Sequence, residues 1–162
     1  MLTAIYNHIK TVLTGIKTEE DKAVIKTVDI WNNQTALPPE EQAFRLPAVF
    51  IEMPGAEYGQ LLNGRQMAEP EIILHVITDS RKGKLETAME INRRLCNLIN
   101  SKLYATKSPV SGPIIRTRSE NDGNFDEWIE NRETYLCCAF DISAQKVWSN
   151  AEIEEIRIAT IG

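Results

Sequence analysis

The sequence lacks the features that define several protein classes. Its apolar runs are short, and the run at residues 72–74 ends at a histidine, whereas a membrane helix needs about 20 apolar residues. Glycine and proline number 8 and 7 in 162 residues, which excludes collagen-like and low-complexity chains. The N-terminus has no basic segment followed by an apolar one, so we expect no secretion signal.

Cysteine and histidine are also scarce. An odd count of three cysteines, with Cys137 and Cys138 adjacent, is a poor disulfide framework and favours reduced thiols in a cytoplasmic protein. Adjacent strand residues point to opposite faces, so the pair is not expected to bind one metal ion. His8 is interpreted as a surface residue and His75 as a hydrogen-bonded sheet histidine rather than a catalytic base.

The charge is unevenly distributed along the chain. Hydrophobic residues make up 43% and charged residues 25%, as in one ordinary globular domain. The net charge of −5 divides into +2 for residues 1–118 and −7 for residues 119–162. This balance argues against a general nucleic-acid binder, and it places the acidity in the last quarter of the chain.

Hydrophobic periodicity predicts two helices and at least five strands. The helices are expected at residues 2–16 and 84–103, the second with a core stripe of Leu85, Ala88, Met89, Leu95, Leu98, Ile99 and Leu103. The strands are expected at residues 24–31, 46–53, 71–78, 114–118 and 134–142. The strand at 71–78 is apolar on both faces and is therefore expected at the centre of the sheet.

This order of elements predicts an α+β fold, a mixed and mainly antiparallel sheet with two helices packed on it. Pro54-Gly55 is expected to stop the second strand, and residues 57–68, with the turn pair Asn63-Gly64, form a projecting hairpin or an irregular loop. We expect a single domain at 1–146 and a C-terminal extension at 147–162, either an edge strand or a subunit-contact arm.

The chemical motifs are weak. Residues 80–84 follow a strand and open a helix, a context that can hold phosphate, but they lack the Walker pattern. Residues 119–131 are read as a polar stretch whose carboxylates match no calcium loop. Arg116 and Arg118 are expected to share one strand face. We therefore predict no catalytic, cofactor-binding or metal-binding residues, which favours a structural or interaction protein.

Apolar residues in projecting segments often mark subunit contacts. Two segments have them, the one around residue 60 and the C-terminal extension. The predicted oligomer interface consists of Tyr58, Leu61, Leu62, Trp148, Ile153, Ile156 and Ile158.

The arrangement resembles the phage tail terminator, or tail completion, proteins of the head–tail joining group. The matching segments are the N-terminal amphipathic helix at 2–13, the strands at 46–51 and 71–78, Gly83 with the long helix at 85–103, and the strands at 114–118 and 135–142. The resemblance covers most of residues 1–146 and is one of order and spacing.

The resemblance implies a non-enzymatic virion protein without a cofactor, forming a homo-oligomeric ring, expected to be a hexamer. Its partners would be the tail tube and head-connector proteins, with DNA passing nearby without specific binding and no membrane contact. It would assemble in the bacterial host cytoplasm and then reside in the tail or neck of the virion. The alternatives are a small phosphate-ligand-binding enzyme and a monomeric adaptor that binds a partner through its C-terminal tail.

Overall fold

The computed structural model describes residues 1–36, 44–61, 64–81, 83–106, 112–121 and 127–141. Within these residues, two helices pack on one sheet of six strands, so the predicted α+β class is confirmed. The helices are α1 (Leu2–Thr14) and α2 (Leu85–Ala105), and η1 (Gln34–Ala36) is a single 3-10 turn. The strands are β1 (Thr27–Ile30), β2 (Ala48–Gln60), β3 (Gln66–Asp79), β4 (Ile115–Asn121), β5 (Trp128–Leu136) and β6 (Ala139–Asp141).

The sheet has the order β1-β2-β3-β5-β4, and β6 pairs with the start of β3. Among the described strands, β1 and β2 form a parallel pair and the other pairs are antiparallel. The strand at 71–78 is the core of β3, and its predicted central position is confirmed. Its inner and outer side chains are almost all buried, which explains why it lacks a polar face.

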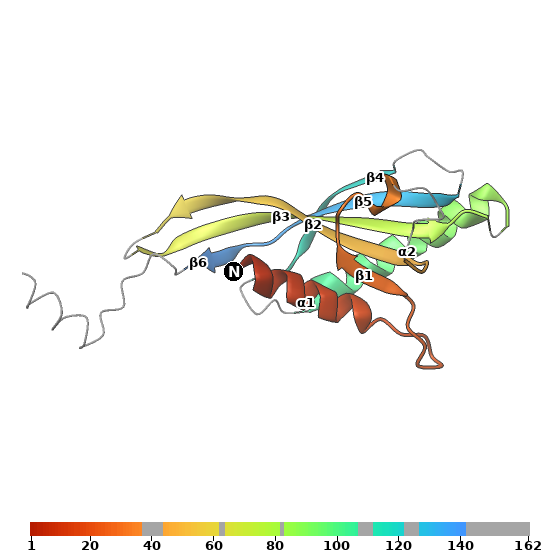
Figure 1. Ribbon diagram of the computed structural model, residues 1–162. Helices are drawn as coiled ribbons and strands as arrows, with labels where there is room; N and C mark the ends of the chain where they lie inside the picture. Colours follow the sequence, from red (N-terminus) through yellow and green to blue (C-terminus); the bar gives the residue numbers. More distant parts are fainter. Residues whose placement is uncertain (37–43, 62–63, 82, 107–111, 122–126, 142–162) are drawn as a thin grey trace, which may run out of the picture.

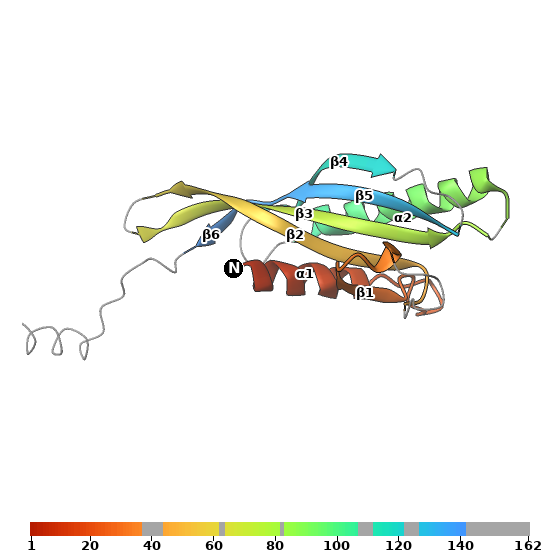
Figure 2. The same cartoon turned by 45° about the horizontal axis from the view of Figure 1, so that its top comes forward.

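Both helices cover the same face of the sheet (Figures 1 and 2). Ile5, Ile9 and Leu13 of α1 lie with Leu95 and Ile99 of α2 in one buried cluster against the sheet. The opposite side of the sheet, here called the open face, has a smaller cluster around Phe50, where Trp31, Phe44, Leu46 and Trp128 pack. Side chains alternate along each strand, so neighbours such as Val49 and Phe50 belong to different clusters.

Two strands are longer than the sequence predicts, and together they form a projecting hairpin. Pro54-Gly55 does not stop β2; the register shifts between Glu52 and Gly55, and the strand then continues to Gln60. A proline is tolerated there because β1 pairs with β2 only as far as Ile51, so Pro54 lies on an edge without a ladder partner among the described strands. We call residues 54–61 and 64–70 the arm, because Leu61 N–H donates to the Arg65 carbonyl beyond the last ladder pair.

The arm extends beyond the helices and beyond the ends of β1 and β5 (Figures 1 and 2). It is a hairpin rather than an irregular loop, with Gln60 paired to Gln66 and Gly64 at a φ of +73° near its tip. Pro70, which has no N–H to donate, lies in the gap between the part of β3 that pairs with β6 and the part that pairs with β5.

That gap corrects the predicted strand at 134–142, which is divided into β5 and β6 at Cys137-Cys138. The polar stretch at 119–131 is also partly strand, because β4 continues to Asn121 and β5 starts at Trp128. Polar residues are accommodated there since β4 is an edge strand and its solvent side needs no apolar cover.

Helix α2 was predicted in the correct place, but its core stripe was partly wrong. Leu85, Met89 and Leu98 are exposed, whereas Asn92 is buried. The Asn92 amide nitrogen lies 3.0–3.1 Å from three acceptors, the Val76 and Ile129 carbonyls and the Thr78 hydroxyl. A polar side chain is stable at this depth only because these partners replace water.

We predict that Asn92→Ala lowers the free energy of unfolding by about 2 kcal/mol, because strand acceptors lose a buried donor. Ile91→Ala, at the exposed neighbouring position, should change it by less than about 0.5 kcal/mol. Urea denaturation followed by circular dichroism measures both. Equal effects of the two substitutions would contradict the role given to Asn92.

Candidate functional site

Two of the predicted interface residues lie on the arm. Tyr58 and Leu61 are 48% and 41% exposed although both are large and apolar. The other predicted interface residues, Leu62, Trp148, Ile153, Ile156 and Ile158, lie outside the described residues, as does the extension at 147–162. The arm is therefore the part of the predicted interface whose surroundings can be examined.

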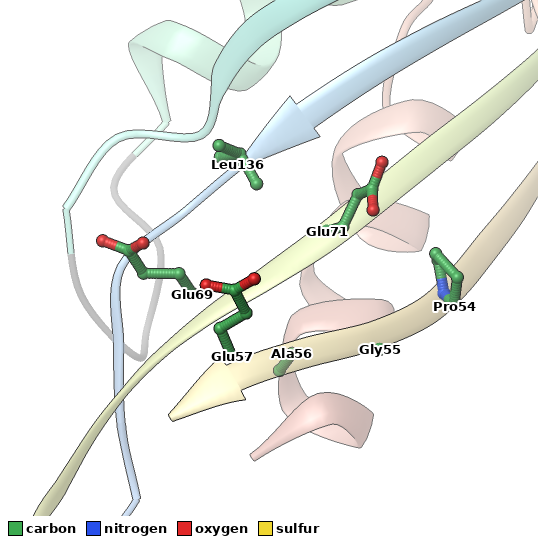
Figure 3. Close-up of a pocket in the computed structure, with 7 residues that line it drawn as sticks. All are labelled: Pro54, Gly55, Ala56, Glu57, Glu69, Glu71 and Leu136. Carbon is green, nitrogen blue, oxygen red and sulfur yellow. The ribbon is translucent and has the colours of Figure 1, made fainter. Parts of the chain in front are cut away.

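A groove of about 430 Å³ lies at the base of the arm on the open face (Figure 3). It is lined by Pro54, Gly55, Ala56, Glu57, Glu69, Glu71 and Leu136. Glu57 and Glu69 are directly opposite each other in the β2–β3 ladder, and Glu71 is two residues further along the same face of β3. The groove thus has a strongly acidic rim, which we call the acidic groove.

A second groove of about 290 Å³ continues from the first around the side chain of Leu136. Leu136 is paired with Ile115 in the β4–β5 ladder, and both side chains are exposed. Pro113 and Cys138 also line this part. The two grooves form one surface with an apolar floor beside three carboxylates, a combination that suits a partner with both apolar and basic groups.

His75 is the centre of a polar cluster further along the open face. Its two ring nitrogens lie 2.7 Å from a Glu130 oxygen and 2.8 Å from a Glu52 oxygen. Trp31 stacks on the imidazole with centroids 3.7 Å apart and an angle of 6° between the planes. His75 and Glu130 are each 3% exposed, and Glu52 is 35% exposed.

This geometry confirms that His75 is a hydrogen-bonded sheet histidine. Arg132 lies 3.7 Å from Glu130, so this buried carboxylate also has a positively charged neighbour. With both nitrogens occupied and one ring face covered by Trp31, the imidazole serves as a link between β2, β3 and β5.

Glu133 is the centre of a second polar cluster, on the helix-covered face. Its side chain is fully buried and lies 2.8 Å from the Arg116 guanidinium. It also accepts hydrogen bonds from Ser119 and Asn131. Burial, with the negative charge of Glu133 as a further cause, raises the pKa of the Cys96 thiol and of the Tyr135 hydroxyl.

The position of Arg116 corrects a prediction. Arg116 and Arg118 do not share a strand face, because a register shift between them places Arg116 opposite Tyr135 and Arg118 opposite Thr134. Arg116 therefore pairs with Glu133 on the helix-covered face, and Arg118 pairs with Glu120. An irregularity of one residue reverses the facing of every later side chain, and the sequence has no marker for it.

The remaining candidate residues are distributed without forming a common site. Cys137 is buried, which raises the pKa of its thiol to about 11, and Cys138 is half-buried. His8 is half-buried rather than at the surface, and desolvation lowers its pKa. At the start of α2, Arg81 pairs with Asp79 at 3.1 Å, while Lys82 lies outside the described residues.

The predicted acidic stretch is also divided. Glu130 is a buried strand residue, whereas Asp122 and Asp126 lie outside the described residues. In the described parts of the chain, no group of three or more histidine, cysteine, aspartate or glutamate side chains is arranged to hold a metal ion. No described helix is both long and apolar enough to cross a membrane.

Comparison with known proteins finds no relative: no family model and no curated protein matches the chain.

The clusters around His75 and Glu133 were missed by sequence reasoning. A signal was present in β5, where Glu130 and Glu133 lie in a strand flanked by aromatic side chains, but the residues that bind them, His75 and Arg116, belong to other strands.

We predict that Glu130→Ala lowers the free energy of unfolding by about 3 kcal/mol, because it leaves a buried imidazole without one of its carboxylates. Glu52→Ala removes the bond to the other nitrogen of the same ring, but its carboxylate is partly in water, so the loss should be below about 1 kcal/mol. Chemical denaturation at pH 7 measures the difference. A loss for Glu52→Ala equal to that for Glu130→Ala would contradict the importance of burial here.

Proposed function

We propose that this chain is a structural subunit that assembles with copies of itself into a ring, expected to contain six. In this proposal the ring is a phage tail terminator: it caps the tail tube and supports head–tail joining. The subunit would assemble in the bacterial host cytoplasm and remain in the tail or neck of the virion. The resemblance in element order supports the class, and the arm supports self-assembly.

The arm is the observation that carries the proposal. A two-stranded hairpin is marginally stable in water by itself, yet this one extends beyond the core with Tyr58 and Leu61 exposed. Of the described strands outside the arm, β6 alone pairs with it, at residues 66–68. Among the described strands none pairs with the outer edge of β2 beyond Ile51, so a row of backbone hydrogen-bonding groups is available there. A partner that covers the arm would bury the exposed apolar side chains and pair with these backbone groups.

The asymmetry of the sheet favours a ring over a two-fold dimer. The outer edge of β2, which has no partner beyond Ile51 among the described strands, lies on one side of β3, and the edge strand β4 lies on the other. Different surfaces that meet in successive copies make a head-to-tail contact, which closes into a ring when the rotation permits.

Only part of the negative charge of residues 119–162 lies on the surface, where it could face DNA that passes through a ring. Glu130 and Glu133 are buried and paired with His75 and Arg116, so they contribute little to a surface potential. Glu120 is exposed and paired with Arg118. Glu57, Glu69 and Glu71 of the acidic groove, by contrast, form no ion pair with a lysine or arginine among the described residues.

We predict that the purified chain is oligomeric, with a mass near 110 kDa for a hexamer of the 18.4 kDa subunit. Tyr58→Ser with Leu61→Ser should weaken association by roughly tenfold or more, because buried aromatic and aliphatic anchors dominate interface energies. Light scattering coupled to size-exclusion chromatography, together with native mass spectrometry, measures the mass.

The matched control is Ile91→Ser with Tyr104→Ser, since both residues are exposed apolar side chains on α2, away from the arm. This control should assemble as the wild type does. A wild-type chain that stays strictly monomeric at high concentration in several buffers would refute the proposal. Loss of assembly in the control alone would move the contact from the arm to α2.

A further inference from the structure

The arm tip, which consists of Leu61 and Arg65 with the neighbouring Phe140, is complementary to the acidic groove at the base of the arm. We propose that the arm tip of one copy binds in the acidic groove of the next copy. The inference rests on the proposed function, because it requires self-assembly, and it goes further by naming the two surfaces that meet. The occupant of the groove is therefore a second copy of this chain.

The acidic groove holds negative charge that its own subunit leaves unbalanced. Glu57 and Glu69 face each other across the β2–β3 ladder, and like charges directly opposite on neighbouring strands are destabilising. In the described residues no lysine or arginine forms an ion pair with Glu57, Glu69 or Glu71. A positive group from outside would relieve this repulsion, while the exposed Leu136 and Ile115 offer apolar contact beside it.

The arm tip has the matching chemistry. Arg65 is exposed, and its guanidinium lies 5.7 Å from the centre of the Phe140 ring, a cation–π contact that holds the side chain in place without neutralising it. Leu61 and Phe140 are exposed beside it, at 41% and 42%. No described carboxylate forms an ion pair with Arg65. The tip therefore combines one free positive charge with apolar side chains.

The arm tip does not occupy the acidic groove of its own subunit. Arg65 precedes Glu69 by four residues along an extended strand, which corresponds to a separation of about 13 Å at roughly 3.3 Å per residue. Because β2 and β3 are paired over the whole arm, the tip has no hinge among the described residues at which it could fold back. Arg65 lies over the Phe140 ring and forms no ion pair with Glu69, so the contact that we propose joins the surfaces of different copies.

A tip-to-groove contact is head-to-tail by construction. Each copy offers one tip and one groove, which are different surfaces, so every copy can bind two neighbours and the series can close. This makes a charge-exchange experiment possible, because either surface can be inverted alone.

The test uses two full-length variants, Arg65→Glu and Glu57→Lys with Glu69→Lys. Each variant by itself carries tip and groove of the same sign and should associate at least roughly tenfold more weakly than the wild type. Mixed at equal concentration, they should assemble again into oligomers that alternate between the two, since every tip then meets a groove of opposite sign. Native mass spectrometry detects the alternating composition.

Two control variants change the net charge equally at exposed positions away from the arm: Arg45→Glu, and Glu19→Lys with Glu86→Lys. Both should assemble as the wild type does. Thermal unfolding checks that the variants are folded. For one of the substitutions we also expect a defined change in the unfolding midpoint. A single Glu69→Lys substitution should raise the unfolding midpoint of the dissociated subunit, because it turns a repulsive cross-strand pair into an attractive one.

The outcomes separate the two proposals. A monomeric wild type would overturn the ring itself. A wild-type ring whose assembly survives both charge inversions, or folded variants that are both monomeric and stay so after mixing, would overturn the tip-to-groove contact and leave the ring standing. Restored assembly only in the mixture supports the contact.

Discussion

The pairing of β2 with β3 is the constraint on which the rest of the structure depends. One continuous antiparallel ladder runs from Ala48 and Ile77 in the core to Gln60 and Gln66 at the end of the arm. In the core the ladder is covered by both helices on one face and by the Phe50 cluster on the other. The register shift between Glu52 and Gly55 separates the core part of this ladder from the arm, and the shifted register of the arm places Glu57 opposite Glu69.

Strand β5 supports that ladder by presenting charge to both faces of the sheet. Glu130 and Glu133 are three residues apart, so they point to opposite faces. Glu130 meets His75 on the open face, and Glu133 meets Arg116 on the helix-covered face. Buried charges are tolerated only when paired, so each contact favours one register of β5 against its neighbours β3 and β4. The arm projects from the sheet that these contacts stabilise.

Much of the fold could be predicted because it depends on local patterns. The amphipathic stripe of α1 and the apolar run of β3 lie within short windows, and the predictions based on them are confirmed. The sequence-based predictions are wrong where a neighbouring element decides whether a residue continues a strand or is buried. Pro54 is compatible with a strand because β1 has already ended, and Leu85 is exposed at the first residue of α2. The arm residues Tyr58 and Leu61 were identifiable as apolar residues in a projecting segment, whereas the acidic groove was not.

The sequence by itself determined the class of fold, the central strand and a projecting segment around residues 57–68, because hydrophobic periodicity and turn residues act over a few positions; that this segment is a hairpin rather than a loop was decided by the structure. Only the tertiary structure decided which side chains meet. His75 binds Glu52 and Glu130 across 23 and 55 residues of chain, and Arg116 separates from Arg118 through a one-residue register shift. Both follow from strand register, which is set when the whole sheet packs against its core and changes the face of every side chain when it shifts by one residue.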